Sequence, residues 1–303
     1  ETYPLQFNSS ISGISATNTV TLKPQTGIVS TIPGSIASNA TIRILSNYVT
    51  IDGSNSGGTD RSLTIQNNNA TSPSVILVGS TGTNPITSVM VKNCTITNGA
   101  QTSTAIIVSD ATLGTAGYFN TVTIQNNLIE KCFNGIYAIG GTTPQNGLNL
   151  FVTSNSINST GVNGVTGTGV YVQGVNGGTI SQNDIGNIAS TTASATQRIG
   201  VWLATGTNNV TIERNRIHDI SFTGTGGWPA AGIKISNGGT GNTNIVIKNN
   251  MIFNITADGD SYTSYGGTYD PIGIYCFASA QSGIGIYNNS INLYGNALNL
   301  AGA

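Results

Sequence analysis

The sequence predicts an all-β fold, a single right-handed parallel β-helix, from three observations. An eight-residue phrase with Asn near its end returns at intervals along the chain. A second phrase, in which Gly or Ala precedes alternating apolar residues, falls between its copies. Only 7% of the 303 residues are charged, against about 25% in ordinary domains, while Val, Ile and Thr recur in short runs that favour strands.

The first phrase reads apolar, polar, apolar, polar, polar, Asn, polar, Ile. Its alternation with a period of two places the apolar residues on one face of a strand. In the first copy, Cys94 replaces the asparagine. The seven copies are VMVKNCTI from Val89, VTIQNNLI from Val122, LFVTSNSI from Leu150, GTISQNDI from Gly178, VTIERNRI from Val210, IVIKNNMI from Ile245 and IGIYNNSI from Ile284.

The asparagines of this phrase are separated by 28, 28, 32, 35 and 39 residues. Strands that return in fixed order at such intervals are typical of stacked coils, with the variable length held in loops. Stacked amides can donate to and accept from one another along the axis, so we expect a buried ladder. The six residues of this ladder are Asn127, Asn155, Asn183, Asn215, Asn250 and Asn289.

The second phrase predicts another strand, whose variable position points outward. Because neighbouring rungs lie about 4.8 Å apart, three successive aromatic side chains at this position would form a flat strip about 10 Å long, which suits a sugar chain. The alternative is that aromatic residues only stabilise neighbouring strands by stacking, and exposure to solvent separates the two. The outward column is Ile107, Tyr137, Tyr171, Trp202, Lys234, Tyr275 and Asn299.

The periodicity divides the chain into two parts. We interpret residues 1–47, which are less regular, as a cap or opening coils, and residues 48–303 as the β-helix. The sequence stops one strand into a new coil, so we expect either further coils of the same chain or end-to-end self-association to cover this face. The loops lengthen toward the C-terminal coils, and loops of such length are often functional.

These C-terminal loops contain most of the polar and aromatic groups that could extend a binding surface. We expect Trp228, Tyr265, His218 and Asp219 to contribute to ligand binding. His218 is the only histidine of the chain. Beside Asp219 it is expected to form a simple hydrogen-bonded pair, with a role as general acid or base as the alternative.

A calcium site is a further candidate in the last long loop. Ca²⁺ prefers several carboxylate and carbonyl oxygens, which Asp258, Asp260 and Asp270 could supply. The full EF-hand pattern is absent, and Asx turns in a Gly-rich loop are the alternative. We expect no other cofactor.

Glycoside hydrolysis would require two carboxylates about 5–9.5 Å apart. The sequence offers several acidic residues in and before the C-terminal loops but does not give the distances between them. The candidates are Glu213, Asp219, Asp258, Asp260 and Asp270.

Charge and hydropathy exclude two classes of partner. The net charge is −1, with Lys and Arg scattered singly, so there is no basic stripe to bind nucleic acid. No stretch approaches the roughly 20 apolar residues that cross a bilayer, so we expect no membrane insertion. The three cysteines, Cys94, Cys132 and Cys276, lack metal-ligand spacing and are interpreted as small buried hydrophobic residues.

From Ala40 to Ala303, these repeats resemble the right-handed parallel β-helix superfamily that includes the pectate lyases. The segment NYVTIDGSNSGGTDRSLTIQNN, from Asn47, also resembles the β-helix modules of large bacterial surface proteins that use the type IX secretion route. This second resemblance implies an exported protein that is displayed at the cell surface.

The resemblance to lyases implies calcium-binding carboxylates and a basic residue on the outer strand face. The matching column here holds aromatic residues and Lys234 but no carboxylate, which argues against lyase chemistry. Arg198, just before its strand, could act as a base only if acidic partners reached it from the loops.

We therefore expect a secreted or cell-surface module, a stalk or adhesin segment, that binds a polysaccharide or cell-surface glycan. The alternatives are a polysaccharide lyase or glycoside hydrolase acting at the C-terminal loops, and a structural subunit that stacks end to end in a fibre. The ligand-binding candidates are Tyr137, Tyr171, Trp202, Lys234, Tyr275, Trp228, Tyr265, His218 and Asp219.

Overall fold

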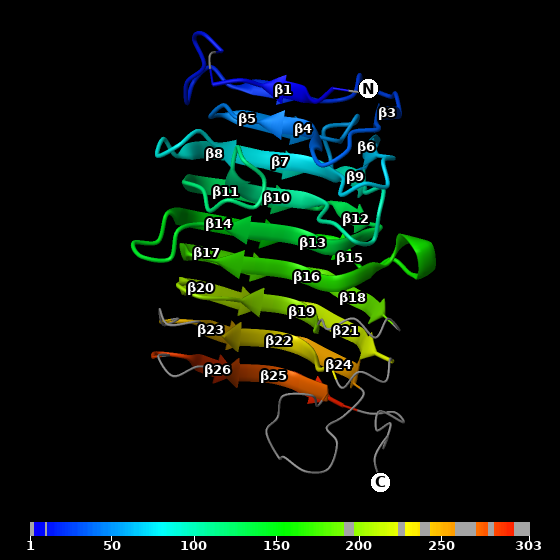
Figure 1. Ribbon diagram of the computed structural model, residues 1–303, viewed down its shortest axis with the longest axis vertical. Coiled ribbons are helices and arrows are strands. Elements are labelled where there is room, and N and C mark those ends of the chain that lie inside the picture. The colour runs from blue at the N-terminus through cyan, green and yellow to red at the C-terminus, as the bar shows by residue number, and fades with distance from the viewer. Residues whose placement is uncertain are drawn as a thin grey trace.

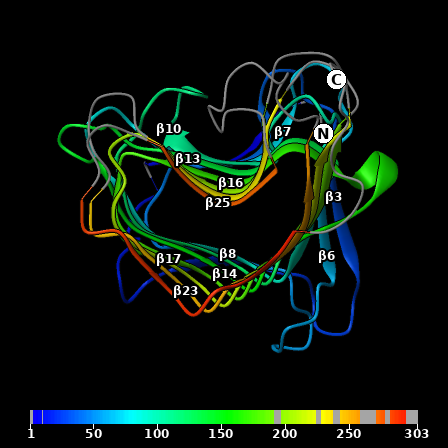
Figure 2. The same cartoon turned by 90° about the horizontal axis from the view of Figure 1, so that it is seen from below.

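The described residues form three parallel sheets that wind around one axis. The computed structural model describes residues 3–9, 11–190, 197–223, 228–236, 243–257, 271–277 and 282–293. Figure 1 shows the rungs stacked from the N-terminal end at the top to the C-terminal end at the bottom, and Figure 2 shows the three sheets around the interior. Each sheet has nine strands within the described residues, and every third strand of the chain joins the same sheet. The predicted parallel β-helix is confirmed.

Sheet A contains the second phrase. Its strands pair in parallel with the strand three positions earlier and later in the chain, as when Ile136 pairs with Val170. In order, its strands are β1 (Leu5–Phe7), β4 (Ala40–Ile44), β7 (Ser74–Ser80), β10 (Ile106–Asp110), β13 (Cys132–Ile139), β16 (Val165–Gln173), β19 (Arg198–Leu203), β22 (Ala230–Ser236) and β25 (Pro271–Phe277).

Sheet B contains the first half of the first phrase. Its alternating residues place Ile124 inside, between Val91 and Val152 of the neighbouring rungs. Its strands are β2 (Val20–Leu22), β5 (Val49–Asp52), β8 (Ile86–Lys92), β11 (Phe119–Gln125), β14 (Gly147–Thr153), β17 (Val175–Ser181), β20 (Asn208–Glu213), β23 (Val246–Lys248) and β26 (Gly285–Tyr287).

Sheet C begins with the last residues of the first phrase, directly after the turn that contains the asparagine. A short 3₁₀ helix, η1 (Gly161–Asn163), lies in the connection between β15 and sheet A. The strands of sheet C are β3 (Ser30–Gly34), β6 (Leu63–Asn67), β9 (Cys94–Thr97), β12 (Leu128–Glu130), β15 (Ser156–Ile157), β18 (Asp184–Ser190), β21 (Arg216–Phe222), β24 (Met251–Thr256) and β27 (Ser290–Asn292).

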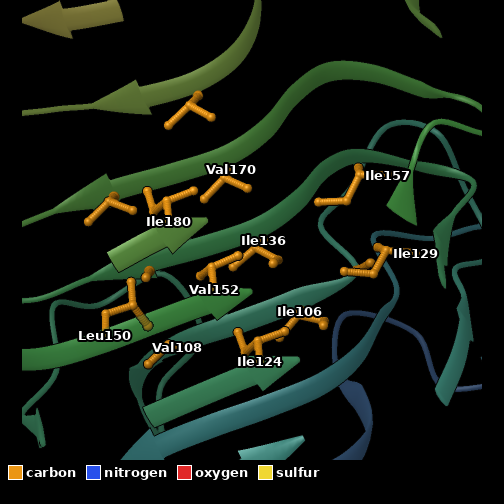
Figure 3. Close-up of a cluster of buried hydrophobic side chains, with 14 of the residues drawn as sticks. Ile106, Val108, Ile124, Ile129, Ile136, Leu150, Val152, Ile157, Val170 and Ile180 are labelled. Carbon is orange, nitrogen blue, oxygen red and sulfur yellow. The ribbon is translucent and has the colours of Figure 1, made fainter. Parts of the chain in front are cut away.

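The core is a column of Ile, Val and Leu side chains that fills the interior along the whole stack. Figure 3 shows part of it, where Ile136 and Val170 from sheet A lie near Val152 and Ile180 from sheet B. These side chains are 0–1% exposed. Full burial of each contributes about 1.5–3 kcal/mol, so the repetition of one rung builds the core with few aromatic residues.

The predicted asparagine ladder is confirmed in the turn between sheets B and C. The Nδ2 of Asn155 donates to Oδ1 of Asn183 at 3.0 Å, and Asn183 donates in the same way to Asn215 at 2.9 Å. The same Nδ2 of Asn155 donates to the backbone oxygen of Ile124. From Asn127 to Asn250, the backbone N–H of each ladder residue donates to the next amide, and Cys94 joins the ladder through its own N–H.

The glycine that opens the second phrase is required by close packing between sheets A and C. A Cβ added to Gly169 would lie 2.5 Å from Cγ2 of Ile185 and 2.6 Å from the backbone oxygen of Gly200. The isoleucine that closes the first phrase therefore occupies the space that a side chain at Gly169 would need. The isoleucine of the first phrase and the glycine of the second therefore depend on each other for packing.

Candidate functional site

The outer face of sheet A carries the aromatic column in the register that the sequence predicts. Tyr137 of β13 pairs with Tyr171 of β16, and Tyr171 pairs with Trp202 of β19. Ile107 of β10 precedes them, and Lys234 of β22 follows. The three aromatic side chains therefore lie on consecutive rungs.

The three rings do not form the flat strip that was expected. Tyr137 and Tyr171 stack with their centroids 4.6 Å apart and their planes at 20°. Trp202 meets Tyr171 edge-on, at 5.1 Å and 75°. The indole is held in this orientation because its Nε1–H donates to Oγ of Ser236 at 2.7 Å and Nζ of Lys234 lies 4.6 Å from its ring centroid.

A hollow of about 280 Å³ opens over these rings, and we call it the aromatic hollow. Tyr137, Tyr171, Trp202 and Trp228 are half-buried, so their rings are partly open to solvent. Amide and hydroxyl groups lie beside the rings, which gives the hollow both apolar surface and hydrogen-bonding groups. Its lining is Phe133, Asn134, Tyr137, Thr168, Tyr171, Gln197, Trp202 and Trp228.

The tyrosine hydroxyls of the column are neutral under ordinary conditions. Burial raises the pKa of Tyr171 to about 12, and the neighbouring Tyr137 adds to this rise. Burial also raises the pKa of Tyr137. The hydroxyl of Tyr171 donates to Oε1 of Gln173 at 2.9 Å, so the ring is fixed on its polar side as well as by stacking.

Lys234 lies in the column but is buried, with 6% of its surface exposed. Its Nζ lies between two ring faces, 4.6 Å from the centroid of Trp202 and 5.4 Å from that of Tyr275, and it donates to Oε1 of Gln197. Burial lowers its pKa to about 8. Lys234 therefore packs beneath the aromatic surface, and Tyr275 follows it in the column on the next rung.

Four residues of the aromatic hollow were not among the predicted site residues, namely Phe133, Asn134, Thr168 and Gln197. Phe133 packs over Gly167, where an added Cβ would lie 2.6 Å from the end of the Phe133 ring. Phe133 is the second residue of β13, and Gln197 directly precedes β19, so both lie just before the second phrase of their rung. An aromatic residue followed by Asn-Gly before an alternating strand was the available signal for Phe133.

His218 and Asp219 lie on β21 of sheet C and not with the aromatic column. His218 is 4% exposed. Its Nδ1 lies 2.5 Å from Oδ2 of Asp219, and its Nε2 lies 2.9 Å from Oδ1 of Asp184. Its ring stacks on Phe253, at 5.1 Å and 9°. The expected histidine–aspartate pair is thus part of a larger network.

Asp184 and Arg216 complete this network and were not predicted. Nη1 of Arg216 donates to Oδ1 of Asp184 at 3.0 Å and lies against the ring of His218. For Asp219, burial raises the pKa, but hydrogen bonds from His218 and Asn254 outweigh it and hold the pKa below its ordinary value. Asp184 directly follows a ladder asparagine in the sequence, and this position gave no functional signal.

The other candidates for acid–base chemistry are dispersed. Glu213 lies on β20 of sheet B, where it forms ion pairs with Arg214 and Lys248. It therefore lies on a different sheet from Asp219. Arg198 is 1% exposed and stacks on the ring of Phe222, and burial lowers its pKa to about 10.

The remaining predicted residues lie outside the described part of the chain. These are Tyr265, the metal candidates Asp258, Asp260 and Asp270, and Asn299, the last member of the predicted outward column. Among the residues that the structure does describe, no group of three or more His, Cys, Asp and Glu side chains is arranged to hold a metal ion.

The prediction of buried cysteines is wrong for one of the three. Cys94 and Cys132 are buried within the core, but Cys276 is exposed on β25. Cys276 belongs to the last described strand of sheet A, which has a neighbouring strand on one side only among the described residues.

The comparisons with known proteins concern the fold. The sequence profile of a family described as a right handed beta helix region matches residues 74–299. No curated protein matches the sequence significantly. Across the described residues, the structure contains no helix that is long and apolar enough to cross a membrane.

Several solved structures resemble the chain at low identity. The DFA-IIIase from Arthrobacter chlorophenolicus A6, in complex with GF2, is 12% identical, with a TM-score of 0.41 over 92% of this chain and 81% of that one. The Dettilon tailspike protein is 11% identical, with a TM-score of 0.38 over 92% and 62%. The A-module of the mannuronan C-5 epimerase AlgE6 from Azotobacter vinelandii is 11% identical, with a TM-score of 0.32 over 93% and 90%. At these identities the likeness concerns the fold alone.

Proposed function

Because the chain belongs to the family of right-handed β-helix regions, we propose that it is an extracellular surface module that binds carbohydrate in the aromatic hollow. The observation that carries this proposal is the row of Tyr137, Tyr171 and Trp202 on consecutive rungs, half-buried and open on one side to a hollow of about 280 Å³. The rest of the stack then acts as a rigid stalk that presents this face.

The chemistry of the lining suits a sugar. Ring faces offer apolar surface to the C–H groups of a pyranose, while the amides of Asn134 and Gln197 can donate to and accept from its hydroxyls. Pockets that combine aromatic walls with a few placed polar groups are typical of small-molecule sites. The row extends along the helix axis over two rung spacings, or about 10 Å, so a linear saccharide would lie parallel to the axis.

The lining favours binding over bond cleavage. Glycoside hydrolysis uses a pair of carboxylates about 5–9.5 Å apart, and the described lining of the aromatic hollow consists of aromatic, amide and hydroxyl side chains. Polar atoms beside rings fix the orientation of a ligand without protonating it. An assay for reducing ends or unsaturated products, on neutral and acidic polysaccharides, would favour the enzymatic alternative if it were positive.

The experiment that tests the binding site is a glycan array, followed by titration calorimetry of the glycan bound most tightly. Trp202→Ala should weaken binding about fivefold, since a stacked ring contributes on the order of 1 kcal/mol. Phe151→Ala is the matched control, because Phe151 is a half-buried outward ring on β14 of sheet B, and it should leave the affinity unchanged. A blank array, or equal loss in both variants, would contradict the proposal.

End-to-end association remains a second proposal for the same module. It is supported by apolar side chains on the last described rung, where Ile286 and Ile291 are 48% and 46% exposed. Covering them with another coil would bury this apolar surface. Sedimentation of the purified chain over a range of concentrations should then reveal dimers or longer rods, and a monomer at every concentration would argue against it.

A further inference from the structure

A second hollow, of about 410 Å³, lies on the outer face of sheet C, and we call it the polar hollow. Its floor is formed by β18, β21 and β24, and one wall by the residues at the start of η1. The described side chains around it are all small or polar, and none of them belongs to the described lining of the aromatic hollow. Its lining is Thr160, Gly161, Asn187, Ala189, Asp219, Ser221, Thr223, Asn254 and Thr256.

Two columns of side chains form the floor. Asn187, Asp219 and Asn254 each follow directly after the paired positions Gly186, His218 and Phe253, so they recur once per rung. All three have left-handed backbone conformations, with φ of 53°, 50° and 51°. Asn and Asp are the non-glycine residues that adopt this conformation most readily.

The second column runs beside the first. Ala189 pairs with Ser221, and Ser221 pairs with Thr256. Along the axis, this second column therefore presents the exposed methyl group of Ala189, followed by the hydroxyl groups of Ser221 and Thr256. Together the two columns present amide, carboxylate and hydroxyl groups over three rungs, which extend about 10 Å.

Among the described residues that line this hollow, Asp219 is the one charged side chain, and it is held in a defined orientation. His218 contacts its Oδ2, and Nδ2 of Asn254 donates to its Oδ1. An ionised carboxylate has about four acceptor positions, so these contacts leave positions for further donors. Its side chain is 38% exposed, so the carboxylate is open to solvent.

The network behind Asp219 keeps it in place. His218 is packed between the ring of Phe253 and Gly186, where an added Cβ would lie 2.6 Å from Cε1 of the histidine. Asp184 and Arg216 contact the far side of the imidazole. His218 is therefore a positioning residue for Asp219, and it does not itself line the hollow.

From this arrangement we propose that the polar hollow is a second ligand site, which takes a neutral polyhydroxylated ligand such as one or two units of a neutral saccharide. Hydroxyl groups of the ligand donate to the carboxylate of Asp219, and the amides of Asn187 and Asn254 bond to neighbouring hydroxyls. An acidic saccharide would bring a second negative charge to Asp219 and is disfavoured. The single carboxylate among the described lining residues also falls short of the several oxygen ligands that Ca²⁺ requires.

The site can be tested by NMR, using the intact chain with assigned backbone amides. The probes are hexasaccharides of β-1,4-glucose, α-1,4-glucose, β-1,4-mannose and β-1,4-xylose, each titrated to millimolar concentration. At least one should shift the amides of Ser221 and Thr256. Asp219→Asn should weaken that binding about tenfold, as expected for a lost hydrogen bond to a charged group.

Two further variants separate this site from the aromatic hollow and from misfolding. Ala189 is exposed, so Ala189→Trp should fill the polar hollow and abolish the shifts without disturbing the core. Trp202→Ala should leave them unchanged, whatever happens to binding in the aromatic hollow. The proposal is overturned if no neutral hexasaccharide shifts these amides, if Asp219→Asn binds like the wild type, or if a hexagalacturonate binds as tightly as the neutral probes.

Discussion

The asparagines inside the turn and the outward side chains of sheet A both recur once per rung, but they vary in opposite ways. The interior position is Asn on each rung from Asn127 to Asn289, while the outer column changes from Tyr171 to Trp202 to Lys234 over three rungs. Each interior amide has the neighbouring amides as its partners, so a change on one rung leaves groups on two others unpaired. An outward side chain can change without this cost. Differences between rungs, and with them function, are therefore expected on the outside.

The largest effect should follow from breaking the interior ladder. Asn183→Ala removes the acceptor of both the backbone N–H and the Nδ2 of Asn155, and the donor to Oδ1 of Asn215 and to the backbone oxygen of Val152. Buried groups left unpaired cost about 1–3 kcal/mol each. The free energy of unfolding should fall by roughly 3–5 kcal/mol, measured by urea denaturation.

Asn176→Ala is the matched control on the outside of the coil. Asn176 accepts a hydrogen bond from Asn209 on the next rung, in an exposed position. Water replaces this partner when it is lost, so the free energy of unfolding should change by less than about 1 kcal/mol. Equal effects of the two substitutions would contradict the contrast between the interior and exterior columns.

A smaller loss of stability should follow when a side chain is added at the close contact between the two phrases. Gly169→Ala places a methyl group within 2.6 Å of both Ile185 and the backbone of Gly200. Overpacking of this kind costs about 1–3 kcal/mol, and urea denaturation should show a decrease in that range. Gly58→Ala is the control, since its added Cβ would meet only Oγ of Ser56, at 3.2 Å. A Gly169→Ala variant as stable as the wild type would show that close packing does not require glycine at this position.

The fold and the columns could be predicted from the sequence because each rung repeats the same local pattern. The position of the asparagine fixes the turn, and alternation fixes which side chains point inward, so the order Tyr137, Tyr171, Trp202 followed without knowledge of the loops. The orientation of Trp202 could not be predicted. It depends on Ser236, which lies on the next rung, 34 residues later in the chain.

The separation of the two hollows was missed, although the sequence contained a signal for it. The first phrase of this rung ends at Ile217, which lies in sheet C. His218 and Asp219 follow directly and so must lie in the same strand, whereas Trp202 precedes this phrase in sheet A. The prediction assigned His218 and Asp219 to the same C-terminal loops as Trp228, and so it did not separate sheet C from sheet A. Asp184 was missed for another reason, since its contact with His218 joins two rungs.

The last effect concerns the outer column itself and depends on pH. Burial lowers the pKa of Lys234 to about 8, below the roughly 10.4 of an exposed lysine. Between these values the unfolded chain binds more protons than the folded one. The contribution of Lys234 to the free energy of unfolding therefore rises with pH across this window and is unfavourable below it.

Lys234→Met isolates this contribution, because methionine keeps an unbranched apolar stem between Trp202 and Tyr275 and cannot titrate. Near neutral pH the variant should be at least as stable as the wild type, since it lacks a buried cation. The free energy of unfolding of the wild type should rise relative to that of the variant as the pH increases from about 8 to the pKa of lysine in the unfolded chain. Tyr171 and Arg198 titrate in both proteins, so their effects cancel in the difference between the two urea midpoints. A difference that stays constant over this window would mean that the Lys234 ammonium is as well solvated in the folded chain as in the unfolded one, and that the outer column is open to water at this rung.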